Sequence, residues 1–270
     1  PKVRITICDI HDAGNISQDL GLSSEDVGYI KGVTGLVIAD LNYDRAFLIG
    51  FHGRKGSGGL FDHTFRPEIT NIKYGNEDVG EITLFTDWLA LHGVPVVLVS
   101  GEDAILDEVK QLQNVFIHVQ EKKLLTNNST TSMLRLNINE VYCSLTMKIK
   151  SALIEDLPQP ITQFDKEIEV YFCNPDILHY LRKKCYFIKD DHLYFRSLIE
   201  FFNNIHSLSL VLNVYIAKLY KVNTSFLRVI EEFKINNDLS GFDVGEITRK
   251  SVVEITYEDR LIVLKSLGLA

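Results

Sequence analysis

The chain has 270 residues, of which 46% are hydrophobic, and its formal net charge is −8 at pH 7. This length suffices for a sizeable core, in two domains or in one large domain with an appendage. The acidic balance argues against a protein that binds nucleic acid, and every apolar run is broken well before the roughly 20 residues that span a membrane.

Strand and helix patterns alternate along the first part of the chain. Strands are predicted at residues 3–9, 45–50, 94–99 and 115–119. Helices are predicted to begin near Ser23, Glu81 and Gly101. This alternation predicts an α/β fold with a mostly parallel sheet flanked by helices, in a first domain of residues 1–119.

A different pattern begins at about residue 120. Residues 122–131 are polar and are predicted to be a flexible connection, and Pro158-Gln159-Pro160 is predicted to be a linker. Other segments predict helices at 137–153 and about 197–220 and a strand at 168–172. We therefore expect a second, smaller α+β domain over residues 120–220 and a helical C-terminal extension over 221–270.

The cysteines and the N-terminal residues indicate the cellular compartment. Cys8, Cys143, Cys173 and Cys185 are far apart and form no CxxC pair, so we expect no disulfides and a reducing cytoplasm. Residues 1–4 lead directly into a strand pattern, which predicts that no signal peptide opens the chain.

The most informative segment runs from Gly50 to Glu81. His52 follows a buried strand, His63 comes eleven residues later, and Glu81 comes eighteen residues after that. A strand that ends in a glycine-flanked histidine presents it at the carboxyl edge of a sheet, where open α/β folds bind ligands. Histidine and carboxylate are ligands for a hydrolytic zinc site that keeps one position open for water. We therefore predict a metallohydrolase.

Each of these residues also has an ordinary structural interpretation. His52 could be a histidine at the end of a strand that hydrogen-bonds to backbone. Glu81 could favour the positive end of a helix dipole, and His63 could be a solvated loop residue. The loop of residues 53–59 lacks the lysine and hydroxyl ending of a phosphate-binding loop. We expect it to be a lid in which Arg54 or Lys55 meets a substrate carboxylate.

These motifs together resemble the D-aminopeptidases, zinc metallopeptidases of the dipeptide-transport operon type. Gly50-Phe51-His52, His63 and Val79-Gly80-Glu81 carry the resemblance, which continues through the run from Val94 to Asp103. The resemblance implies one or two zinc ions, with Asp9 bridging the metals and with His52 and Glu81 as further ligands. It also implies that His63 acts in catalysis, as an acid/base or as a nucleophile.

The N-terminal segment departs from the family pattern. The family begins with Asp-x-Glu-Gly, whereas this chain has Asp9-Ile10-His11-Asp12. His11 could replace the glutamate as a zinc ligand, and Asp12 could also reach the site. A further ligand of the family, the histidine of an Asn-Asp-Ser-His segment, has no counterpart here. Either a metal is lost, or His11 and Asp12 rebuild the site, or the chain is a non-catalytic relative.

The resemblance implies a zinc-dependent amide hydrolase in which a metal-bound hydroxide attacks a short peptide or an aminoacyl amide. It also implies a homo-oligomer, in the family's form a decamer of two pentameric rings. Two alternatives stay open. One is a relative that has lost hydrolysis and serves as a binding or scaffold subunit, and the other is a tailoring enzyme in a small-molecule pathway.

Overall fold

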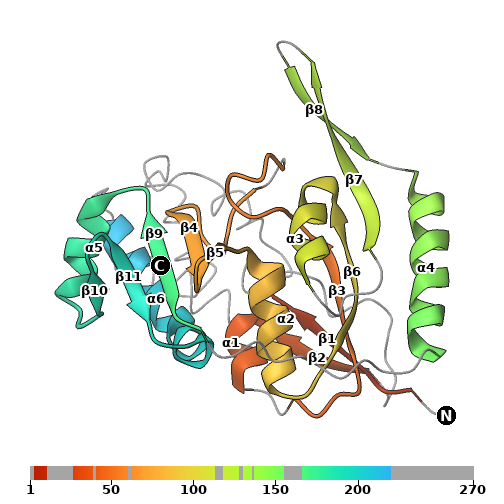
Figure 1. Cartoon of the computed structure of the whole chain (residues 1–270), viewed down its shortest axis with the longest axis horizontal. Coiled ribbons are helices and arrows are strands. Elements are labelled where there is room, and N and C mark those ends of the chain that lie inside the picture. Colours follow the sequence, from red (N-terminus) through yellow and green to blue (C-terminus); the bar gives the residue numbers. More distant parts are fainter. Residues whose placement is uncertain are drawn as a thin grey trace, which may run out of the picture. The chain divides into compact units, whose positions relative to one another are not determined.

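A computed structural model describes residues 3–10, 27–38, 41–59, 62–112, 118–127, 130–135, 137–154 and 166–219 (Figure 1). The chain divides into two compact units. One unit combines residues 1–39 with residues 203–270, and the other consists of residues 40–202.

The unit that contains the N-terminus holds a small parallel sheet. Strand β1 (Ile5–Asp9) pairs in parallel with β2 (Val27–Lys31), so that Asp9 lies opposite Lys31. Helix α1 (Gly32–Ile38) follows β2 directly and packs against both strands. The predicted first strand is therefore present. The helix start predicted at Ser23 lies outside the described residues, and the segment that follows it is a strand.

The first sheet of the unit formed by residues 40–202 is mostly parallel. Its strands are β3 (Ala46–Phe51), β6 (Val96–Glu102), β7 (His118–Asn127) and β8 (Thr130–Arg135), in the order β3-β6-β7-β8. The pairs β3–β6 and β6–β7 are parallel, and β7–β8 is antiparallel. Every residue of β6 is buried, as expected for a central strand covered on both faces.

Helices surround this sheet, as the sequence pattern predicts. They are α2 (Glu81–Leu91), the 3₁₀ turn Asp103–Ile105, α3 (Leu106–Gln111) and α4 (Ile138–Ile154). In α4, Leu145, Ile149 and Ala152 pack against Val97 and Leu98 of β6. The strand–helix alternation thus correctly predicts an α/β fold, and these packing contacts join its helices to the sheet.

The second sheet of this unit is antiparallel. Its strands are β4 (Ile69–Tyr74), β5 (Glu77–Asp78), β9 (Ile168–Phe172), β10 (Ile188–Lys189) and β11 (His192–Phe195), in the order β10-β11-β9-β4-β5. Helix α5 (Pro175–Arg182) begins at Pro175, where the side chain of Asn174 accepts a hydrogen bond from the Asp176 amide at 2.9 Å. Helix α6 runs from Leu198 to Leu219.

An aromatic cluster forms the core next to the second sheet. Phe201 and Phe202, at the start of α6, are at most 1% exposed. Their rings contact those of Phe65, Phe85 and Trp88 at centroid distances of 4.8–6.5 Å. Buried aromatic pairs of this kind contribute about 0.5–1.5 kcal/mol each beyond the area that they bury.

One sequence prediction is wrong and others fall outside the described residues. Residues 122–131 are largely the hairpin β7–β8, the green hairpin in Figure 1, and not a flexible connection. Asn127 pairs with Thr130, so polar residues lie in the strands of a hairpin whose backbone groups bond across the ladder. The predicted Pro158–Pro160 linker and the extension of residues 221–270 lie outside the described residues.

The predicted domain boundaries stay a prediction. Strands β4 and β9 lie on either side of the boundary predicted at residue 120, yet they pair within one antiparallel sheet. This pairing joins segments that are about a hundred residues apart, which local sequence patterns do not encode.

Candidate metal centre

The site is built around His52, at the carboxyl end of β3. The strand ends at Phe51, and the half-buried His52 follows it. Its Nδ1 lies 3.1 Å from the carbonyl oxygen of Gly53. Because a carbonyl can only accept a hydrogen bond, the neutral ring carries its proton on Nδ1 and its lone pair on Nε2. The backbone contact therefore orients the imidazole for a ligand at Nε2.

Glu81 faces His52 from the start of α2. It is the first residue of that helix, and its Oε1 lies 3.8 Å from His52 Nε2. The same oxygen accepts a hydrogen bond from the Phe65 amide at 2.7 Å. Glu81 thus lies at the positive end of the helix dipole, as its ordinary interpretation requires, and also lies beside an imidazole.

His63 completes the group. Its ring stacks on that of His52, with centroids 4.0 Å apart and planes inclined by 20°. One ligand atom from each of His52, His63 and Glu81 lies within 4.8 Å of the others. The three residues that the sequence singled out in this segment, two as metal ligands and one as a catalytic residue, therefore lie together.

The donor set fits zinc. Two imidazole nitrogens and one carboxylate oxygen are the three protein ligands of many catalytic zinc sites, which keep a fourth position for water. Two donors on a tetrahedral zinc lie roughly 3.4 Å apart at bond lengths near 2.1 Å. Small side-chain rotations would therefore close this group around one ion. In this arrangement His63 is as well placed to be a ligand as to carry a proton.

Phe65 occupies a strained turn beside the site. Its φ is +58°, in the left-handed region that bulky residues avoid. The Arg66 amide donates to the Thr64 carbonyl at 2.6 Å, which closes a three-residue γ-turn around Phe65. A backbone conformation of this kind costs on the order of 1–3 kcal/mol, so surrounding contacts must hold it.

Glu108 of α3 caps the helix that carries Glu81. Its Oε1 accepts hydrogen bonds from the Gly80 and Thr83 amides, each at 2.9 Å, and from the Thr83 hydroxyl at 2.8 Å. A Cβ at Gly80 would collide with Glu108 and would lie 2.8 Å from Arg54 Cβ. Glycine at this position therefore lets the carboxylate approach the first turn of α2.

Opposing effects act on the Glu108 carboxyl. Burial raises its pKa above the ordinary value, whereas the hydrogen bonds from Thr83 and Gly80 and the charge of Arg54 lower it. Arg54, predicted to contact substrate, therefore lies close enough to Glu108 to stabilise a buried negative charge.

The loop of residues 53–59 is held at its start and in its middle. The Gly53 amide donates to Glu102 Oε1 at 2.7 Å, and Glu102 is only 4% exposed. The Gly56 amide donates to Asp62 Oδ2 at 2.9 Å, and Lys55 Nζ lies 3.6 Å from Asp62 Oδ1. The predicted lid is thus tied to two carboxylates, one of which pairs with Lys55.

The structure leaves two predicted ligands untested. Asp9 ends β1 in the other compact unit, where it is 3% exposed and accepts a hydrogen bond from the Tyr29 hydroxyl at 3.0 Å. Burial, followed by this bond, raises the pKa of Tyr29 to about 12. His11, together with Asp12, lies outside the described residues. The roles of Asp9 and His11 stay predictions.

Sequence reasoning missed three residues that support the site. Glu102 follows an apolar strand in Gly101-Glu102-Asp103, a run that the family resemblance marked without giving it a role. Glu108 gave no signal, because a carboxylate on a short helix is usually solvated. Phe65 gave none either, since the sign of φ at a non-glycine residue is not written in a sequence.

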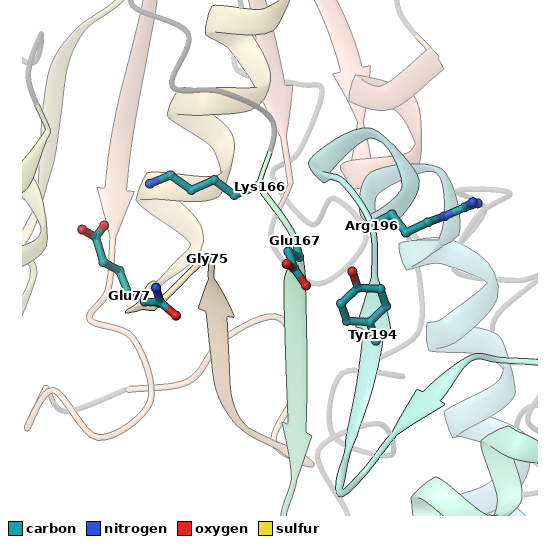
Figure 2. Close-up of a pocket in the computed structure, with 7 residues that line it drawn as sticks. Gly75, Glu77, Lys166, Glu167, Tyr194 and Arg196 are labelled. Carbon is teal, nitrogen blue, oxygen red and sulfur yellow. The ribbon is translucent and has the colours of Figure 1, made fainter.

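A separate cavity of about 550 Å³ opens beside the second sheet (Figure 2). Several of its charged and polar groups bind neighbouring side chains. Tyr194 hydrogen-bonds Glu167, Arg196 pairs with Glu200 at 3.3 Å, and Lys166 lies over the Tyr74 ring. We assign this cavity no function. Its lining is Gly75, Asn76, Glu77, Lys166, Glu167, Tyr194 and Arg196.

Comparison with known proteins identifies the class. The model of a peptidase family described as D-aminopeptidase matches residues 4–177. Because this match covers more than half of the chain, the chain belongs to the D-aminopeptidase family. No curated protein matches it.

A solved structure has the same fold. It is the Zn-dependent D-aminopeptidase DppA from Bacillus subtilis, described as a self-compartmentalizing protease. The TM-score is 0.65 with 20% sequence identity, and the match covers 77% of this chain and 78% of that one. Within the described residues, no helix is both long and apolar enough to cross a bilayer.

Proposed function

We propose that this member of a peptidase family is a zinc-dependent amide hydrolase that acts on a short peptide or an aminoacyl amide. The observation that carries the proposal is the convergence of His52, His63 and Glu81, whose ligand atoms lie within 4.8 Å of one another. Family membership supports the reaction class, and the Zn-dependence of DppA supports the choice of metal.

In this proposal His52 and Glu81 would hold zinc. When bound, zinc supplies an activated water and polarises the carbonyl that is attacked. His63 would take a proton from the nucleophile and return it to the leaving amine, since its ring lies against that of His52. Asp9 would bind a second zinc ion, with His11 as the ligand that replaces the family's glutamate.

Lys55 and Arg54 would bind the substrate carboxylate. Lys55 is 44% exposed and pairs with Asp62, so an incoming carboxylate would share or replace that partner. Arg54 would contribute less, because its charge also compensates the buried Glu108.

A cytoplasmic homo-oligomer completes the proposal. DppA is a self-compartmentalizing protease, which supports an assembly of copies here and, in its predicted form, a decamer. Cys8, Cys143, Cys173 and Cys185 are all free thiols, which supports a reducing compartment.

The test is hydrolysis of a panel of short peptides and aminoacyl amides of both chiralities, with and without a chelator. We expect turnover that the chelator abolishes and that added zinc or cobalt restores. His52→Ala should lose it, whereas the variant of an exposed histidine, His179→Ala, should retain it. A protein that binds no zinc and gains no activity would contradict the proposal and favour a binding or scaffold subunit. Products other than hydrolysis products would favour the tailoring enzyme.

A further inference from the structure

The turn at residues 64–66 connects the site to the aromatic core. Phe65 at its centre has a φ of +58°, although it is neither glycine nor asparagine. The ring of Phe65 lies 5.8 Å from that of Phe85 and 5.6 Å from that of Phe201. These contacts hold a turn that local preference alone would not form.

The backbone of the same residue contacts the site. The Phe65 amide donates to Glu81 Oε1 at 2.7 Å, a hydrogen bond to a carboxylate and hence a strong one. Glu81 and Phe85 are four residues apart on α2 and therefore lie on one face of that helix. Phe65 thus contacts a single helix twice, by its amide at Glu81 and by its ring at Phe85.

The turn also carries His63. Thr64 is 1% exposed, and its hydroxyl accepts a hydrogen bond from the Lys55 amide at 3.3 Å. The residue before it, His63, is therefore attached to a fixed backbone when its ring stacks on His52. One strained turn accordingly sets the positions of two of the three clustered side chains.

We propose that Phe65 is a positioning residue of the zinc site, which holds the side chains of Glu81 and His63 in place. Its ring, packed against Phe85 and Phe201, keeps the 64–66 turn in the left-handed form, and this form aims the Phe65 amide at Glu81 and places His63 over His52. The inference rests on the proposed function, since it concerns the geometry of that same site.

The test compares two replacements of Phe65. Phe65→Ala removes the anchor but keeps the steric penalty on positive φ, so the turn should relax and release Glu81. Phe65→Gly also removes the anchor but tolerates positive φ, so it should keep more of the turn. We expect zinc affinity, measured by competition with a chelating indicator, to fall by about 10- to 100-fold in the alanine variant. The glycine variant should bind several-fold more tightly than the alanine variant.

Phe195→Ala is the matched control. Phe195 is 3% exposed and its ring contacts Phe201 at 5.5 Å. Its loss should lower thermal stability as the loss of Phe65 does, and should leave zinc affinity within about twofold. If Phe65→Ala does not fold, Phe65→Leu replaces it, with the loss expected to be smaller. The NMR shift of the Phe65 amide proton gives a second measurement. It should differ between the wild-type protein and Glu81→Gln, because this amide donates to Glu81.

The outcomes separate the two claims. A wild-type protein that binds no zinc contradicts the proposed function and the inference together. If the wild-type protein binds zinc and both Phe65 variants bind it as tightly as the wild-type protein does, the inference alone is overturned. An equal loss in Phe195→Ala would also overturn it, because the effect would then come from core packing.

Discussion

The geometry of the site allows His63 two roles. His63 lies in reach of a cation shared with His52 and Glu81, and it is also placed to exchange protons with a nucleophile beside that cation. We expect His63→Ala to retain zinc and to lower kcat by about 10²- to 10⁴-fold, the range of a lost general acid/base.

The control for this change is His179→Ala, which removes an exposed histidine outside the cluster. Metal content and kcat are measured on the same preparations. Loss of zinc from His63→Ala, with His179→Ala unchanged, would contradict the catalytic role and make His63 a ligand.

At the scale of single residues, the sequence predicts the clustered side chains and not their supports. His52, His63 and Glu81 stand out because their spacing follows a strand, a loop and a helix start. Glu108 and Phe65 act through a helix cap and a left-handed backbone. Such roles depend on tertiary contacts that do not alter the local pattern.

Among the helices, α2 depends on Glu108 for its start. Its N-cap is Gly80, which provides no side-chain cap, so the Glu108 carboxylate from α3 satisfies the Gly80 and Thr83 amides instead. Glu108→Ala should lower the free energy of unfolding by about 1–3 kcal/mol, because it leaves buried donors without acceptors. We also expect weaker zinc binding, by about 10-fold or more, since Glu81 begins this helix.

Glu108→Gln should largely restore both properties, because its amide oxygen can accept the same hydrogen bonds. Val109→Ala, at a neighbouring buried position of α3, serves as the control for lost packing. Chemical denaturation and zinc titration provide the readouts. Equal free energies of unfolding in Glu108→Ala and the wild-type protein would contradict the capping role, and equal zinc affinity in all of these proteins would contradict its effect on the site.

Helix α2 also contains a buried carboxyl. Asp87 is 6% exposed, and burial raises its pKa to about 6, with the charge of Lys166 opposing that shift. The folded state therefore binds more protons than the unfolded state between about pH 4 and pH 6. The contribution of Asp87 to the free energy of unfolding is therefore fully present below pH 4 and is lost as the pH rises through 6.

Asp87→Asn removes the buried charge and should raise Tm at pH 7.5 by roughly 3–6 °C. The gain should disappear near pH 4, where the wild-type carboxyl is protonated in the folded state and the buried charge is absent. Asp107→Asn is the control, since the Asp107 side chain is 93% exposed. Thermal scans at the two pH values measure the effect, and an equal gain at both would contradict a charge-based cause.

At the scale of elements, local periodicity predicts well where the chain alternates regularly. Strand β6 and helix α2 are predicted because an apolar run and a helical stripe occur at Val96–Val99 and at Ile82, Phe85 and Leu89. The hairpin β7–β8 is missed, because lysine and asparagine weaken the apolar signal where strand pairing supplies the order.

At the scale of the whole molecule, the proposed homo-oligomer predicts the molecular mass in solution. Because the chain is 30.7 kDa, light scattering should give a multiple of this value, and the decamer would give ten times it. A monomer over a wide range of protein concentrations would contradict the assembly. Activity of such a monomer would in addition show that hydrolysis does not require it.

The sequence also predicts the α/β class and the family for the whole molecule, because both rest on patterns that persist over long stretches. It does not predict the pairing of β4 with β9. Long-range pairings depend on which surfaces are left to bury after local elements form, and residues distant in sequence decide this.

The central claim is that His52 and Glu81 hold one zinc ion with His63 beside it. The most direct test is the amount of zinc bound per chain after dialysis against buffered zinc, in the wild-type protein and in His52→Ala. We predict at least one tightly bound zinc per wild-type chain and at least one fewer in His52→Ala. A wild-type protein without zinc, or a variant with an equal amount, would contradict the claim.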